Sequence, residues 1–140
     1  MVGLTPVANA ALMGALIALL DSGTGAGYCR PFGGARPATG GAPSGAPICT
    51  ITLAEPCGTV DPVTGAMVLT ATDNLGTNGQ IANAATPTWV RFYMPDATVV
   101  MDLDARLAAA PDLGQEVVLS ATALNIGAFL RLVSGGFTAA

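Results

Sequence analysis

The chain has 140 residues, of which 51% are hydrophobic and only 10% charged, and its formal net charge is −4. It contains no His and no Lys, which removes the commonest general base, the commonest zinc ligand and the amine of Schiff-base chemistry. Five arginines against nine acidic residues argue against nucleic-acid binding, which needs clustered cations to replace the counterions of phosphates.

So few charges leave much of the surface neutral or apolar, which favours burial against a partner in a homo-oligomer or a larger assembly. The alternative is that the high Ala and Gly content inflates the hydrophobic count, because Ala is only weakly hydrophobic. The length fits a single domain, 1–140, that can bury one core.

The first expected element is an α-helix at about 6–21. Thr5 is a candidate N-cap, Pro6 suits the first helical position and Gly23 suits a left-handed C-cap. The spacing predicts an apolar stripe that packs on a sheet, formed by Leu12, Leu16, Leu19 and Leu20. The alternative is a helix that binds a partner. The apolar run 7–20 is shorter than the ~20 residues of a bilayer span. No basic residue precedes it, so we expect neither a membrane segment nor a signal peptide.

Seven short strands separated by Gly- and Pro-rich turns are expected after the helix. They are 28–32, 48–53, 66–72, 88–94, 98–104, 116–124 and 128–134. Pro31 favours a sheet edge for the first of them, because proline cannot donate to a β-ladder. The pattern predicts a mainly β fold, an antiparallel β-sandwich or barrel of about seven strands with one N-terminal α-helix.

The connections between these strands have the composition of turns. Residues 55–65, 105–115 and 125–127 are expected to be turns or loops. Residues 73–80 ("DNLGTNGQ") could suggest a calcium loop, but they lack the spaced carboxylates and terminal Glu of an EF-hand, so a turn is favoured.

The longest connection is the Gly/Pro loop 33–47 ("GGARPATGGAPSGAP"), whose glycines and prolines oppose regular structure. A loop of this length is usually functional or mobile. It could be an arm that orders against a neighbouring subunit, with Arg36, Pro37, Pro43 and Pro47 as candidate contacts, or a mobile excursion.

The segment 88–104 predicts a hairpin with two distinct faces. Trp89, Arg91 and Tyr93 alternate onto one face, where the Arg can stack on aromatic rings, and they are candidate partner contacts. The other face of the first strand is wholly apolar. Arg91 could meet Asp102 across the hairpin, in a pairing that fixes register more than it stabilises.

No active site is predicted. Carboxylate pairs could act without His, but Asp102 with Asp104, and Glu55 with Asp61, are better explained as solvated surface charge. Glycine-rich stretches match no phosphate-binding motif. Cys29, Cys49 and Cys57 lack metal or redox spacing and are expected to be free thiols, with a bridge from Cys57 to either of the others as the alternative. We expect no catalytic residue, cofactor or metal.

Several motifs together resemble a family of small virion structural proteins of tailed bacteriophages. The matching stretches are "ANAALMGALIALLDSGTGAG", "GGARPATG", "ITLAEPCG", "TPTWVRFYMPDATVVMD" and "DLGQEVVLSATALNIGAFLRL". The sequence departs from the family pattern in "CRPF", where an aliphatic and Tyr strand is usual, and in the Ala- and Arg-rich run after Asp104.

The resemblance implies a non-enzymatic protein of the virion, made in the host cytoplasm, with coat protein or other virion subunits as partners. A capsid decoration or cement protein is the first expectation. A tail or head–tail connector component is the alternative, and a fibre-borne carbohydrate- or receptor-binding module using Trp89 and Tyr93 is a third.

Overall fold

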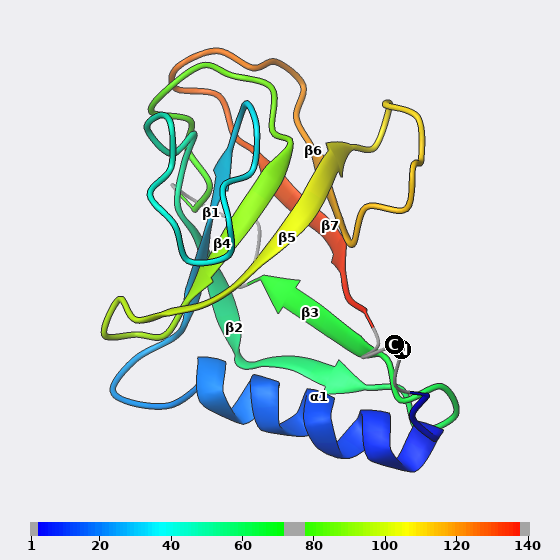
Figure 1. The fold of residues 1–140 in the computed structure, drawn as a ribbon. Coiled ribbons are helices and arrows are strands. Elements are labelled where there is room, and N and C mark those ends of the chain that lie inside the picture. The colour runs from blue at the N-terminus through cyan, green and yellow to red at the C-terminus, as the bar shows by residue number, and fades with distance from the viewer. Residues whose placement is uncertain (1–2, 72–77, 138–140) are drawn as a thin grey trace.

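The computed structural model describes residues 3–71 and 78–137 and has a mainly β fold with one N-terminal helix (Figure 1). Its elements are α1 (Pro6–Leu20), β1 (Tyr28–Phe32), β2 (Ile51–Val60), β3 (Met67–Ala71), β4 (Trp89–Tyr93), β5 (Val99–Leu107), β6 (Val117–Ser120) and β7 (Arg131–Gly135). The expected fold class is therefore confirmed.

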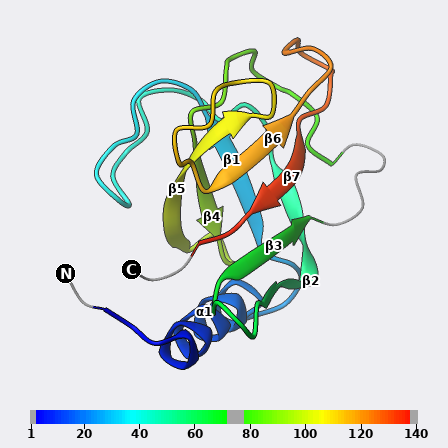
Figure 2. The same ribbon diagram turned by 90° about the vertical axis from the view of Figure 1, so that its right-hand side faces the viewer.

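The strands form one mixed sheet in the order β3-β2-β1-β4-β5-β6-β7, and the sheet curls into a nearly closed barrel (Figure 2). Its two ends meet where the backbone N–H of Met67 in β3 donates to the carbonyl of Phe137, just after β7, at 3.0 Å. The expectation of a wholly antiparallel sheet is wrong, because β5 and β6 run parallel. The segment 108–116 between them consists of turns and bends and returns the chain to the start of β6.

The barrel interior is filled by the inward-facing side chains of all seven strands. Its largest fully buried side chains on the strands are Phe92, Ile51, Leu53, Met67, Leu119 and Val90. Residues on alternate strand positions point outward, as a half-buried sheet requires. The apolar face expected for β4 is confirmed, since Val90 and Phe92 are both buried.

Helix α1 packs across β2 and β3 at one end of the barrel (Figure 1). The predicted start is confirmed, because Thr5 Oγ1 accepts a hydrogen bond from the N–H of Ala8. The C-cap is Asp21 and not Gly23. The buried face of the helix comprises Asn9, Met13, Ile17 and Leu20. The predicted stripe is thus wrong in part, because Leu12 and Leu19 are exposed.

Three strand predictions need correction. Strand β2 continues through residues 55–60, predicted as a turn, and absorbs the irregular stretch as a register shift between Leu53 and Gly58. Strand β5 extends to Leu107 into the predicted connection. Strand β1 lies between β2 and β4 and is not an edge. Pro31 is tolerated because regular pairing with β2 ends at Cys29, before a donor would be needed.

Most of the predicted turn 73–80 lies outside the described residues. The hairpin turn after β4 is confirmed, with the N–H of Met94 donating to the carbonyl of Thr98. The turn at 125–127 is also confirmed by a hydrogen bond from Ala128 to the carbonyl of Asn125. In the described parts of the chain, no helix combines the length and the hydropathy that a membrane crossing requires.

Candidate interaction surfaces

The outer face of β1 and β4 carries a regular ladder of aromatic and arginine side chains. The antiparallel register sets them in opposite pairs, Tyr28–Tyr93, Arg30–Arg91 and Phe32–Trp89. Both aromatic pairs stack, with ring centroids 4.8 Å apart for the tyrosines and 4.4 Å apart for Phe32 and Trp89. The two ends of this face are therefore aromatic and its middle is cationic.

Arg91 is buried together with Asp102 of the neighbouring strand β5. Its Nε donates to Asp102 Oδ1 at 2.7 Å and its Nη2 donates to Oδ2 at 2.9 Å, which is the two-pronged geometry that suits a guanidinium and a carboxylate. The side chains are only 5% and 0% exposed. The predicted cross-strand pairing is confirmed, but it lies inside the protein, so the expectation of a solvated Asp102 is wrong.

The surroundings of Asp102 favour its ionised form. Burial on its own would raise the pKa of this carboxyl. Hydrogen bonds from Arg91 and from the N–H of Gly40, with the nearby charges of Arg91 and Arg36, outweigh burial and hold the pKa below its ordinary value. The hydrogen bond to Asp102 correspondingly raises the pKa of Arg91. The pair is ionised at neutral pH.

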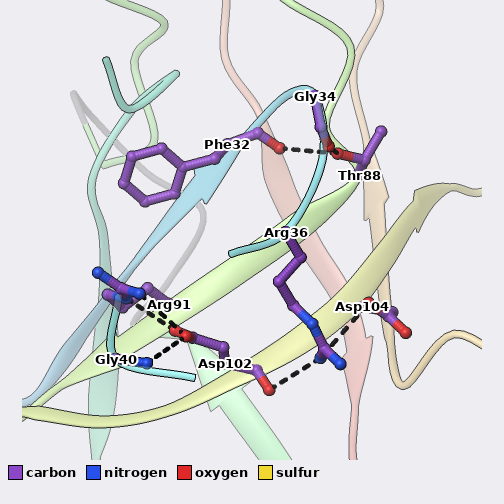
Figure 3. A network of polar contacts seen from close by, with 8 residues as sticks. All are labelled: Phe32, Gly34, Arg36, Gly40, Thr88, Arg91, Asp102 and Asp104. Atoms are coloured by element: carbon purple, nitrogen blue, oxygen red, sulfur yellow. Dashed lines mark hydrogen bonds and ion pairs between the residues drawn. The ribbon is translucent and has the colours of Figure 1, made fainter. Parts of the chain in front are cut away.

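This ion pair also fixes the middle of the Gly/Pro loop 33–47 (Figure 3). The Nη2 of Arg91 donates to the carbonyl of Gly41 at 2.7 Å, and the N–H of Gly40 donates to Asp102 Oδ2 at 3.0 Å. Arg36, from the same loop, donates to the carbonyl of Asp102 at 3.2 Å and pairs with Asp104 at 3.4 Å. The loop thus closes over the ladder and covers its Phe32–Trp89 end.

The ends of the loop are anchored as well. Thr88 Oγ1 donates to the carbonyl of Gly34, and Asn83 Nδ2 donates to the carbonyl of Pro47 at 2.9 Å. The loop has no helix or strand, as predicted, but it is held against its own barrel at both ends and at its centre. In Figure 2 it stands out from one side of the barrel.

The predicted contact residues fall into two groups. Arg36 is exposed, and the prolines of the loop are half-buried: Pro37, Pro43 and Pro47. Tyr93 is also half-buried. Trp89 is only 1% exposed and Arg91 only 4%, so in this fold neither offers surface to a partner. The sequence located the ladder, but it did not show that the loop would cover one end of it.

A second surface is the outer face of α1, for which partner binding was only the alternative expectation. Leu12 and Leu19 are 47% and 42% exposed, and with Leu16 and Phe137 they line an apolar groove of about 420 Å³. No charged residue lies between Pro6 and Leu20. That absence was the available signal, because a surface helix normally carries a polar face opposite its buried face.

The second carboxylate pair considered in the sequence, Glu55 with Asp61, does not form a site. Asp61 accepts hydrogen bonds from the N–H groups of Val63 and Thr64 within a turn, and Glu55 is exposed. The described residues contain no group of three Cys, Asp or Glu placed to hold a metal ion.

All three cysteines are free and buried. Cys49 lies in the core as predicted. Cys57 contacts α1, with its Sγ 3.8 Å from the carbonyl oxygen of Ile17. Burial raises the pKa of Cys49 and of Cys57 to about 12, so both are neutral thiols at physiological pH.

Comparison with known proteins finds no matching family model, no matching curated protein and no matching solved structure.

Proposed function

We propose that this chain is a bacteriophage virion structural protein, and specifically a capsid decoration protein that binds the major coat protein. The observation that carries the proposal is the outer face of α1, an apolar and uncharged surface on an otherwise well-packed barrel. Exposed apolar surface of this kind is a common mark of a protein–protein interface. A coat protein would cover the face with apolar side chains of its own.

The Gly/Pro loop supports the same role. It is already held by the Arg91–Asp102 pair in the free chain, so a partner would not have to order it on binding. A pre-ordered loop loses less conformational entropy on association, which raises affinity. In a particle that binds many copies, modest contacts of this kind add up.

The tail or connector role is the second candidate and would use the same two surfaces. The motifs that resemble phage virion proteins support both locations equally. The carbohydrate-binding role has less support, because a sugar needs a free aromatic face. Trp89 is buried under Phe32 and the ring of Tyr93 is stacked on Tyr28, so the expected platform is occupied.

The proposal predicts that charge on α1 prevents incorporation into particles. The test is quantitative protein stoichiometry of purified particles of the encoding phage, carrying wild-type chain or the double variant Leu12→Glu/Leu19→Glu. We expect many wild-type copies per particle and at least about tenfold fewer variant copies. The two leucines would be buried against the coat protein, and replacing them removes more than ~1.4 kcal/mol of binding free energy.

The matched control is Leu113→Glu/Ile126→Glu, which adds the same two charges at exposed apolar positions away from α1. This control should incorporate like the wild type. Absence of the wild-type chain from particles would reject the virion assignment. Equal loss of both double variants would mean that charge, and not the α1 face, controls incorporation.

A further inference from the structure

The five arginines are not equivalent in their partners. Three form ion pairs, which are Arg36–Asp104, Arg91–Asp102 and Arg106–Asp112. Arg30 and Arg131 have no carboxylate partner in the parts of the chain that the structure describes. The chain has a formal net charge of −4, so two arginines without a carboxylate partner form a local positive patch if they lie on one face.

Arg30 is held in a fixed position on the outer face of β1. Its Nε donates to Thr50 Oγ1 at 3.1 Å, and its guanidinium carbon lies 5.2 Å and 5.5 Å from the ring centroids of Tyr28 and Tyr93. Its two terminal nitrogens donate no hydrogen bond within the described residues. The side chain lines an open groove of about 430 Å³ with the polar side chains of Thr50, Gln80 and Asn83.

Arg131, at the start of β7, is fixed in a similar way. Its Nη1 donates to the carbonyl of Asn78 at 2.8 Å, and its guanidinium carbon lies 4.6 Å from the centroid of the Phe129 ring. It lines a second open groove, of about 470 Å³, which includes Ser120 and Thr122. Each arginine is therefore positioned by one hydrogen bond and by aromatic contact, with donors left over.

The two arginines flank one short segment, residues 78–80, which is a turn at Asn78 and Gly79 followed by a single bridge residue, Gln80. On one side, the N–H of Gly79 donates to the carbonyl of Thr50, the residue that holds Arg30. On the other, the carbonyl of Gly79 accepts from the N–H of Leu130, next to Arg131. Arg30 and Arg131 are thus held by residues on opposite sides of Gly79, and each lines its own groove. Gln80 lines the groove of Arg30, and its side chain donates to the carbonyl of Gly127, which lines the groove of Arg131.

We infer that Arg30 and Arg131 form a two-point site for an acidic segment of a partner polypeptide, with one carboxylate bound at each guanidinium. A carboxylate accepts the paired N–H donors of a guanidinium in a planar geometry. This site is a second part of the surface with which the chain would bind its partner. That the partner is a protein rests on the proposed function. Unlike the α1 face, this site would select its partner by charge.

Two other anionic ligands fit the site less well. An acidic sugar would need a free ring face, but the faces of Tyr28 and Tyr93 are stacked on each other. A nucleic acid needs several phosphate contacts for useful affinity, and two arginines on an acidic chain supply few. An acidic peptide needs only the guanidinium donors, and the amide and hydroxyl groups of the grooves can bond its backbone.

The test is titration of the isolated chain with hexaglutamate at low salt, followed by NMR of the arginine Nε–H groups, which report on each guanidinium separately. We expect saturable shifts of the Arg30 and Arg131 signals that disappear at high salt, with the Arg91 signal unchanged because it is buried on Asp102. Hexaglutamine is the uncharged control peptide and should shift neither signal.

The variant experiment compares Arg30→Gln/Arg131→Gln with Val63→Glu/Leu113→Glu, because each double variant adds two negative units to the formal net charge. We expect each single Arg→Gln change to weaken hexaglutamate binding at least about threefold and the double change to abolish it. The charge control, Val63→Glu/Leu113→Glu, should weaken hexaglutamate binding only slightly, through its change in net charge, and this loss should depend on salt concentration.

Three results would overturn the inference. One is the absence of saturable shifts at Arg30 and Arg131 in the wild type, which requires no variant to fold. Another is equal weakening by the two double variants. The third is displacement of hexaglutamate by a six-residue oligothymidylate at lower concentration, which would assign the site to phosphate. These measurements use the isolated chain, so their failure is distinct from a failure to incorporate into particles.

Discussion

Asp102 joins the β4–β5 hairpin to the Gly/Pro loop, which is distant in sequence. Its carboxylate accepts from Arg91 of β4 and from the N–H of Gly40 in the Gly/Pro loop, and its own carbonyl accepts from Arg36. A buried ion pair is worth little in itself, but breaking it by removing one partner leaves an uncompensated charge. We therefore regard Asp102 as the residue on which the position of the loop depends.

At this scale we predict that Asp102→Asn lowers the free energy of unfolding by about 3 kcal/mol, because Arg91 is then buried without a counter-charge. Urea denaturation measures the change. The control is Asp112→Asn, which removes the carboxylate of a pair whose Asp side chain is 69% exposed and should cost less than about 1 kcal/mol. Limited proteolysis should also cut the loop 33–47 faster in the Asp102 variant. Similar costs for both variants would contradict the buried role.

The same carboxylate predicts how stability depends on pH. Because the folded state holds the pKa of Asp102 below that of the unfolded chain, about 3.9, the ionised carboxylate stabilises the fold fully above that pH. The contribution is lost as the pH falls from about 4 through the lower pKa of the folded state.

Denaturation of wild type and Asp102→Asn at several pH values between 7 and 2 measures this contribution. The gap between the two should be constant above pH ~5 and should narrow below pH ~4, where the wild type also loses its charge. The comparison cancels Asp96, whose pKa is also lowered, chiefly by hydrogen bonds from Thr98. A gap that stays constant down to pH 2 would contradict the assignment.

Among the elements, α1 is positioned by the turn that precedes β3. Gly65 in this turn has a φ of +75°, and a Cβ there would lie 2.6 Å from the Cβ of Asn9 and from the carbonyl oxygen of Pro6. The helix approaches the turn so closely that only glycine fits. The buried face of α1 is therefore set by a contact with the barrel and not by the pattern of the helix.

We predict that Gly65→Ala destabilises the fold by both backbone strain and steric overlap. Gly114→Ala is the matched control, because Gly114 also has a left-handed φ, of +90°, but has open space at its Cβ. The control should cost about 1 kcal/mol, and Gly65→Ala at least about 1 kcal/mol more. Thermal or urea unfolding measures both, and equal costs would mean that α1 moves freely away from the turn.

At the scale of the whole molecule, the barrel is closed by the contact between β3 and the end of β7, and α1 covers β2 and β3 next to that seam (Figure 2). The reactivity of the three cysteines measures whether the barrel is closed. All are buried, and burial raises the pKa of each thiol. Thiolate formation, and with it reaction, requires that the structure open.

We predict that the native chain reacts with Ellman's reagent at pH 8 at least about a hundredfold more slowly than the unfolded chain, which should yield three thiols. In the folded chain Cys57 should react first, since it lies directly beneath α1 and is uncovered when the helix detaches. Peptide mapping of the first labelled site checks the order. Rapid native labelling of all three would contradict a closed barrel.

Much of the secondary structure could be predicted because it depends on neighbours in sequence. The strand at β4, the Thr5 cap before Pro6 and the turn after β4 follow from local patterns, and each is confirmed. The boundaries of β2 and β5 were not predictable in the same way. Both strands run into residues of turn composition, which are held extended by hydrogen bonds to neighbouring strands.

The candidate surfaces were also predictable only in part. Composition alone determined that this protein has few charges, and the hairpin pattern of residues 88–104 predicted that Arg91 could meet Asp102. Only the tertiary structure decided that this pair is buried and holds the Gly/Pro loop, because burial depends on which segments cover a strand. The tertiary structure also decided which face of α1 is exposed. A helix that is apolar on every side does not specify which side packs, so its docking on the barrel selected the face left exposed.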